Sequence, residues 1–143
     1  MSPVGYSGKS LAEKLGVRAG SRVCVEGAEL LAMAWTALVE CEDVALDADE
    51  FDLIHLFVVR EDALRAGLVR ALERLAAGGA IWVSWPKKAS GVATEVTEDT
   101  IRAVALPMGL VDIKVCAVTE VWSGLKLVRR KTDGKSRGSG PPR

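Results

Sequence analysis

The chain has 143 residues, of which 49% are hydrophobic and 27% are charged, and its 19 basic and 19 acidic side chains cancel. This length suits one domain that builds a hydrophobic core without disulfides or a metal. No apolar run reaches the roughly 18 residues of a membrane span, and the first ten residues hold no signal-peptide core. We therefore expect a cytoplasmic protein that does not contact a membrane.

Charge is distributed unevenly along the chain. The stretch from residue 129 onward is rich in Lys and Arg, which leaves the preceding part acidic. We expect residues 131–143 to form a disordered basic tail. Such a tail could bind nucleic acid weakly and in a salt-dependent way. It has no aromatic side chain for base stacking, so a solubilising role is favoured over nucleic-acid binding.

The cysteine and histidine content argues against disulfides and metal sites. Cys24, Cys41 and Cys116 are far apart, and Cys24 and Cys116 are flanked by apolar residues. This pattern is typical of small buried side chains in a reducing compartment. No CxxC motif occurs and His55 is the only histidine, so we predict no metal site.

We predict a single domain over residues 10–130, preceded by a flexible arm at residues 1–9. Ser10 and Glu13 have the spacing of a capping box that starts a short helix, and Gly16 is placed to end it. The other expected elements are a strand at 22–26, a helix at 28–39, a short strand of undecided direction at 43–46, a strand at 51–59, a helix at 61–77, a strand at 80–85, a helix at 97–106, and strands at 110–118 and 121–130.

The order of these elements indicates the fold class. Strands alternate with helices, which predicts an α/β domain with a mostly parallel sheet and helices on both faces. The linker between the last two strands is too short for a parallel crossover, so they should pair antiparallel. The prediction is a three-layer, Rossmann-like open sheet with a C-terminal antiparallel hairpin.

Several segments resemble known families. The run over residues 71–85, with Gly78-Gly79 before a strand, resembles the helix–Gly-Gly–strand segment of class I methyltransferases, and Phe51-Asp52-Leu53 resembles the start of their central fourth strand. Further similarity covers residues 6–15, 51–57, 82–94 and 121–127, which resemble a family of short bacterial proteins of unknown function. The resemblance implies a methyltransferase-like fold, but it implies no particular activity.

The sequence departs from the methyltransferase pattern after its first strand. Those enzymes place an acid and several closely spaced glycines there, because the backbone must approach the cofactor. Here Glu26 is followed by a single glycine, Gly27, and the stretch to Phe51 is too short for the two strands and two helices of the full fold. We therefore expect a shortened fold with a degenerate cofactor site. Glu26 and Gly27 are the residual candidates for binding S-adenosylmethionine.

A second candidate site follows the strand at 80–85. Ligands of open α/β sheets collect at the carboxyl ends of the strands. The loop there contains Lys87, Lys88, Ser90 and Gly91, and with the N-terminus of the next helix these groups could hold a phosphate or carboxylate. Trp122, at the start of the last strand, could border the same pocket. The alternative is a solvated basic loop and an indole that anchors the hairpin.

We predict no catalytic residue. His55 lies in the middle of a strand, away from the strand end where a general base would reach substrate, so we expect a hydrogen-bonded core histidine. Trp82 and Trp85 lie on opposite faces of one strand, which favours core packing. The leading interpretation is a non-catalytic, methyltransferase-like binding domain for a small anionic ligand or a protein partner. The alternatives are a reduced S-adenosylmethionine-dependent methyltransferase and a nucleic-acid accessory protein acting through the tail. The oligomeric state is not predicted.

Overall fold

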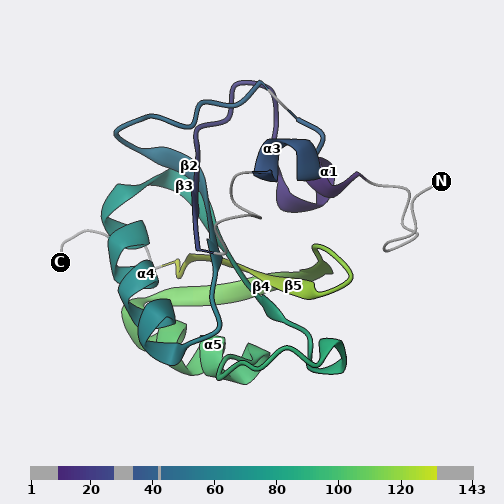
Figure 1. Cartoon of the computed structure of the whole chain (residues 1–143). Coiled ribbons are helices and arrows are strands. Elements are labelled where there is room, and N and C mark those ends of the chain that lie inside the picture. Colours follow the sequence, from purple (N-terminus) through teal and green to yellow (C-terminus); the bar gives the residue numbers. More distant parts are fainter. Residues whose placement is uncertain (1–9, 28–33, 42, 132–143) are drawn as a thin grey trace, which may run out of the picture.

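A computed structural model describes residues 10–27, 34–41 and 43–131 (Figure 1). Its elements are α1 (Leu11–Leu15), β1 (Val23–Glu26), α3 (Trp35–Leu38), β2 (Phe51–Phe57), α4 (Glu61–Arg74), β3 (Leu75–Pro86), the 3-10 turn η1 (Lys88–Ser90), α5 (Glu98–Ala105), the 3-10 turn η2 (Leu106–Met108), β4 (Leu110–Ala117) and β5 (Trp122–Arg129). Three expected segments lie outside the described residues: the arm at 1–9, all of the tail at 131–143 except its first residue, and the first part of the helix at 28–39.

The five strands form one sheet in the order β1-β2-β3-β5-β4. β1, β2 and β3 run parallel, with Leu53 of β2 opposite Val23 on one side and Ala80 on the other. β5 runs antiparallel to both β3 and β4. This confirms the predicted α/β open sheet, mostly parallel and closed by an antiparallel hairpin.

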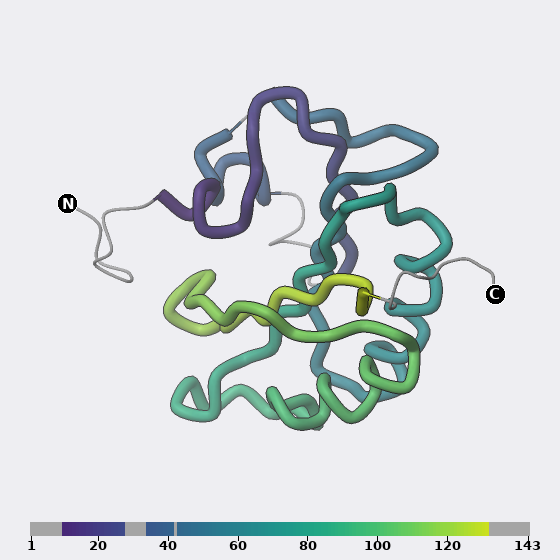
Figure 2. Tube along the Cα trace, turned by 180° about the vertical axis from the view of Figure 1, so that it is seen from behind, coloured from purple at the N-terminus to yellow at the C-terminus, as the bar shows by residue number. Residues whose placement is uncertain are grey.

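Helices cover both faces of the sheet, as Figures 1 and 2 show from opposite sides: α4 and α5 lie on one face, and α1 and α3 on the other. The alternation of side chains along β3 separates the two layers. Trp85 packs into the core with α4 and α5, whereas Trp82 packs beneath α1 and donates its indole N–H to the Leu15 carbonyl at 2.9 Å. The two tryptophans are core residues on opposite faces, as predicted.

The caps of α1 follow the sequence pattern. The Glu13 N–H donates to Ser10 Oγ at 3.1 Å, and the Ser10 N–H donates to Glu13 Oε1 at 2.9 Å. Gly16 ends the helix in the left-handed conformation, with φ of 84°. The predicted capping box and helix stop are confirmed. None of the described helices is long and apolar enough to cross a membrane.

β1 lies at one edge of the sheet, in keeping with a shortened fold. On its outer side the Val23 N–H donates to the Ala45 carbonyl at 2.8 Å, and the Ala45 N–H donates to the Ser21 carbonyl at 2.8 Å. Together these make a single parallel bridge. The strand expected at 43–46 is therefore wrong, because only Ala45 of this largely exposed, acidic connection pairs with the sheet. The bridge settles the undecided direction as parallel.

The boundary between α4 and β3 also differs from the prediction. The helix expected to reach residue 77 ends at Arg74, because Leu75 is already extended and pairs with Phe51 of β2. Gly78 has a φ of 78°, and a Cβ on Gly79 would lie 3.0 Å from the Asp52 carbonyl oxygen. The Gly-Gly pair therefore forms an irregularity within β3, where the register against β2 shifts, and is not the helix stop.

The three cysteines are half-buried and form no disulfide. They are less buried than the apolar flanks of Cys24 and Cys116 predicted. Burial nevertheless raises the pKa of the Cys24 and Cys116 thiols, which favours the uncharged form of both side chains.

Candidate functional site

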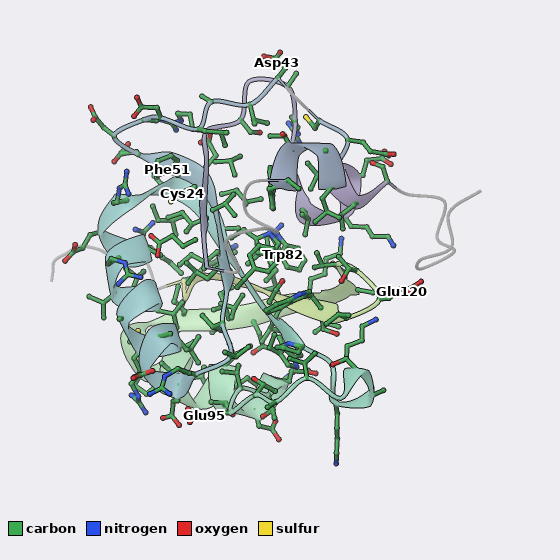
Figure 3. All side chains as sticks on the ribbon, viewed as in Figure 1. Cys24, Asp43, Phe51, Trp82, Glu95 and Glu120 are labelled. Carbon is green, nitrogen blue, oxygen red and sulfur yellow. The ribbon has the colours of Figure 1, made fainter. Side chains whose placement is uncertain are left out.

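Most of the residues singled out in the sequence gather at one end of the sheet. β1 ends at Glu26, β2 ends at Phe57, and β3 ends at Pro86 beside Trp122, the first residue of β5. The chain after β3 returns along this end, where the Glu95 N–H donates to the Val59 carbonyl at 2.8 Å. In Figure 3, Glu95 lies at this carboxyl end and Asp43 at the opposite, amino end.

Glu26 is already engaged by a cation of its own chain. Nη2 of Arg70, on α4, lies 2.7 Å from Glu26 Oε1. The hydrogen bond and the charge of Glu26 raise the pKa of Arg70, so this guanidinium stays charged. The charge of Glu26, the residue predicted to bind a cofactor, is therefore balanced by Arg70 of the same chain.

Gly27 brings the chain against the end of β2. Its φ is 84°, and a Cβ at this position would lie 2.1 Å from the Phe57 carbonyl oxygen, so only glycine is accommodated. The cavity beside it, which Gly67 and Arg70 also line, has a volume of about 80 Å³. Cofactor sites occupy roughly 300–1,000 Å³. The cavity that the described residues line beside Gly27 is smaller than this range.

His55 is fully buried and held by two hydrogen bonds. The indole Nε1–H of Trp35 donates to His55 Nδ1 at 3.0 Å, and His55 Nε2 lies 2.7 Å from Ser84 Oγ. An indole can only donate, so Nδ1 is the acceptor and Nε2 carries the proton, which it donates to Ser84. Burial lowers the pKa of His55 to about 3. His55 is thus a neutral core histidine, as predicted, and cannot take a proton from Ser84.

Aromatic rings connect this buried histidine to the strand ends. The ring of Phe57 stacks on His55 with centroids 4.3 Å apart, and Trp122 meets Phe57 edge-on at 5.3 Å. Trp122 is half-buried and pairs with Pro86 at the end of β3. Its indole packs against the core and stays partly exposed.

The Lys87 loop lies directly beside Trp122. The Lys87 N–H donates to the carbonyl of Val121 at 2.7 Å, which ties the loop to the start of β5. Neither the Lys87 nor the Lys88 ammonium makes a hydrogen bond or ion pair with any described residue. The backbone of a loop with two unpaired lysine side chains is therefore tied to the residue that precedes Trp122.

Ser90 and Gly91 shape this loop. Ser90 Oγ donates to the Lys87 carbonyl at 2.6 Å and accepts from the Val92 N–H at 3.1 Å. Gly91 has a φ of 79°, and its N–H donates to the Lys88 carbonyl. The Ser90 hydroxyl and the Gly91 N–H therefore already have hydrogen-bond partners within the turn, which leaves the two lysines and Trp122 as candidate ligand contacts.

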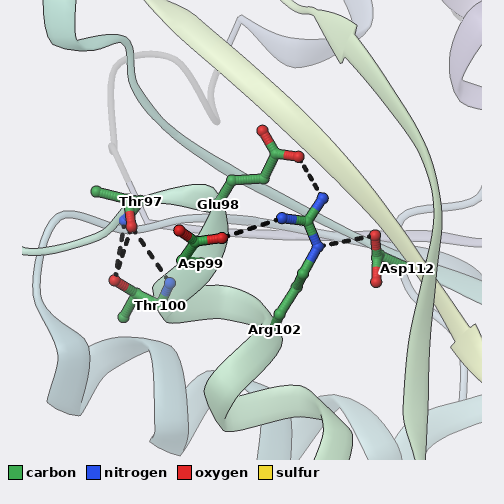
Figure 4. Close-up of polar contacts among 6 residues, drawn as sticks. All are labelled: Thr97, Glu98, Asp99, Thr100, Arg102 and Asp112. Carbon is green, nitrogen blue, oxygen red and sulfur yellow. Dashed lines mark hydrogen bonds and ion pairs between the residues drawn. The ribbon is translucent and has the colours of Figure 1, made fainter.

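The N-terminus of α5 was expected to contribute to anion binding. Figure 4 shows the side chains around it: Thr97, Glu98, Asp99, Thr100, Arg102 and Asp112. Thr97 Oγ1 accepts from the Thr100 N–H at 3.2 Å, and two carboxylates stand in the first turn. Arg102 forms ion pairs with these two carboxylates, Glu98 and Asp99, and also contacts Asp112 of β4 at 3.0 Å. The cap and acids of this helix already complement the positive end of its dipole, so the proposal below does not use its N-terminus.

No three His, Cys, Asp or Glu side chains of the described residues come close enough together to hold a metal ion.

Solved structures identify the class of fold. The chain is similar to a methyltransferase from Pyrococcus furiosus, with 14% identity and a TM-score of 0.56 over 82% of this chain and 78% of that one. It is also similar to magnesium protoporphyrin IX methyltransferase from Synechocystis PCC 6803, solved with bound S-adenosylmethionine, with 14% identity and a TM-score of 0.55 over 83% and 74% of the two chains. At these identities the likeness concerns the fold alone. The chain is an α/β domain with a methyltransferase-like fold.

The chain is shorter than some of these enzymes. It matches the ribosomal protein L11 methylase of Lactobacillus delbrueckii subsp. bulgaricus with 18% identity and a TM-score of 0.48, over 85% of this chain, but it spans only 64% of that enzyme. Residues 30–131 match the family described as "Protein of unknown function (DUF3052)", and the chain belongs to this family. No curated protein matches it.

Proposed function

We propose that this domain binds a small anionic ligand at the carboxyl ends of its strands and does not catalyse a reaction. The observation that carries the proposal is the 2.7 Å hydrogen bond from the Lys87 N–H to the Val121 carbonyl. It ties the loop that carries Lys87 and Lys88, whose ammonium groups have no partner among the described residues, to the residue that precedes the half-buried Trp122.

The ligand class follows from these side chains. Lysine ammonium groups act as mobile point charges for phosphate or carboxylate. The Trp122 indole offers an apolar wall against which a carbon skeleton can pack. An organic phosphate or carboxylate with an apolar or ring-shaped part suits this combination. An acidic segment of a protein partner carries similar chemistry and is distinguished by the experiment below.

Two features favour binding over catalysis. Arg70 neutralises Glu26 beside a cavity of about 80 Å³, and the fold family would hold the amino end of S-adenosylmethionine at that place. His55 has its proton on the nitrogen that faces Ser84 and no access to solvent. The alternative is a reduced methyltransferase. The fold of the solved neighbours supports it, but neither the Glu26–Arg70 pair nor His55 does.

The three unbonded cysteines suit a reducing compartment, so we place the protein in the cytoplasm. The basic tail at 132–143 lies outside the described residues, and the proposal gives it no part in ligand binding.

Calorimetric titration of the full chain with phenyl phosphate and with inorganic phosphate tests the proposal. Lys87→Gln and Lys88→Gln should each weaken binding of both probes about tenfold, the cost of one charge-assisted contact. Trp122→Ala should weaken only phenyl phosphate. Lys131→Gln, a matched loss of one exposed charge, should change neither affinity. Unchanged affinity in both lysine variants would contradict the proposal. If neither probe bound and an acidic peptide did, the result would favour a protein partner over a small ligand.

A further inference from the structure

A cavity lies at the amino ends of the strands, opposite the proposed ligand site. It has a volume of about 450 Å³ and lies between the C-terminal end of α1, the loop that precedes β1, and the first residues of the paired parts of β2 and β3. This volume falls within the range of roughly 300–1,000 Å³ that small-molecule sites occupy. No binding site was predicted from the sequence at this end of the sheet.

The wall of this cavity is built mainly of small residues and backbone. Gly20 and Gly78 have φ values of 87° and 78°, and a Cβ on either would meet no heavy atom within 4 Å. The loop and strand ends therefore turn sharply and leave open space. No aromatic side chain lines the cavity among the described residues. A compact polar molecule suits these walls better than one with a large ring.

The acid in the wall is neutralised by its neighbour. Both oxygens of Asp52 accept hydrogen bonds from the Arg22 guanidinium, at 2.7 and 3.1 Å, and Oδ2 also accepts from the Arg22 backbone N–H at 2.9 Å. These bonds hold the pKa of the Asp52 carboxyl below its ordinary value. Asp52 therefore stays ionised, with its charge balanced by Arg22, and does not repel an anion in the cavity.

Two other cations face the cavity without a counter-charge. The side chains of Arg18 and Lys126 line it, and neither makes a hydrogen bond or ion pair with a described residue. The Lys126 ammonium lies 3.8 Å from where a Cβ on Gly16 would stand, which places it against the end of α1. Ser21 accepts the Arg18 backbone N–H at 3.0 Å, so its own hydroxyl proton is directed elsewhere.

We infer that this cavity is a second anion site, which takes a small phosphorylated molecule without an aromatic ring. Arg18 supplies a planar fork of donors for a phosphate group, Lys126 a point charge and Ser21 a hydroxyl donor. The site shares no residue with the Lys87 loop, so the inference does not depend on the function proposed above and can be tested separately.

Backbone amide NMR of the full chain, titrated with pyrophosphate, tests this inference at residue level. Gly20 and Gly78 report on the cavity, and Gly91 reports on the Lys87 loop. We expect saturable shifts at Gly20 and Gly78 whose dissociation constant rises about tenfold in Arg18→Gln and in Lys126→Gln and is unchanged in Lys88→Gln. The dissociation constant of adenosine monophosphate, read from the same two amides, should not be lower than that of pyrophosphate.

Two results would overturn the inference. One is the absence of saturable shifts at Gly20 and Gly78. The other is an unchanged dissociation constant at these two amides in both cavity variants. If Gly91 alone responded to pyrophosphate, the cavity would be excluded while the site at Lys87 stood. Thermal unfolding of each variant, read by circular dichroism, confirms that a lost shift reflects lost binding and not lost folding.

Discussion

Trp35 Nε1 donates a hydrogen bond to His55 Nδ1 at 3.0 Å, and this contact fixes the tautomer of a fully buried imidazole. The remaining proton is on Nε2, from which it is donated to Ser84 Oγ. The Ser–His pair has the spacing of a catalytic dyad but the opposite hydrogen-bond direction. Its role is to satisfy polar groups in the core between α3 and the sheet.

The buried imidazole makes stability depend on pH. The pKa of His55 is about 3 in the folded chain, against 6.5 for an unperturbed histidine. Above pH 6.5 the side chain is neutral in both states and its contribution to stability is complete. As the pH falls below 6.5, only the unfolded chain gains the proton, so the folding equilibrium constant should fall about tenfold per pH unit towards pH 3.

Urea unfolding at pH 7, 6 and 5 measures this loss, above the range in which most carboxylates titrate. His55→Leu should make the stability nearly independent of pH in this interval. An equally steep fall in His55→Leu would show that another group is responsible.

Ser84→Ala should destabilise the protein by about 1–3 kcal/mol, because it leaves the His55 Nε2–H buried without its acceptor. The same change in a His55→Leu background should cost less, since no donor is then left unpaired. Chemical denaturation of the single and double variants gives the coupling free energy. Strictly additive effects would mean that the 2.7 Å contact contributes nothing.

Gly27→Ala should lower the free energy of unfolding by about 3–5 kcal/mol, since it adds a Cβ at 2.1 Å from the Phe57 carbonyl to an unfavourable φ of 84°. Gly20→Ala is the matched control, with a φ of 87° but open space around the new Cβ. It should cost only about 1–2 kcal/mol, the penalty of the left-handed conformation. Similar losses in the two variants, measured by urea unfolding, would refute the close approach of β1 and β2.

Much of the fold could be predicted because local patterns dictate it. The apolar run of Phe51 to Phe57 indicated a central parallel strand, and the capping box of Ser10 and Glu13 indicated where α1 begins. Gly78-Gly79 was assigned to a helix stop because two glycines usually end a helix. Pairing of Leu75 with Phe51 takes precedence over that local preference, and such a pairing across the sheet has no signature in the sequence.

The candidate sites were harder to predict for the same reason. Glu26 was recognised by its place at a strand end, but its partner Arg70 is 44 residues away on a helix that carries several arginines. Nothing in the sequence selects Arg70 among them. Arg18 and Lys126 come from opposite ends of the domain, and only the tertiary structure brings them to one cavity.

The proposal that this domain does not bind the methyltransferase cofactor is tested most directly by calorimetric titration of the full chain with S-adenosylmethionine and S-adenosylhomocysteine. The Glu26–Arg70 pair and the contact of Gly27 with Phe57 predict no measurable binding of either compound. Micromolar binding that is abolished in Glu26→Ala, with the variant still folded, would contradict the account and favour a reduced methyltransferase.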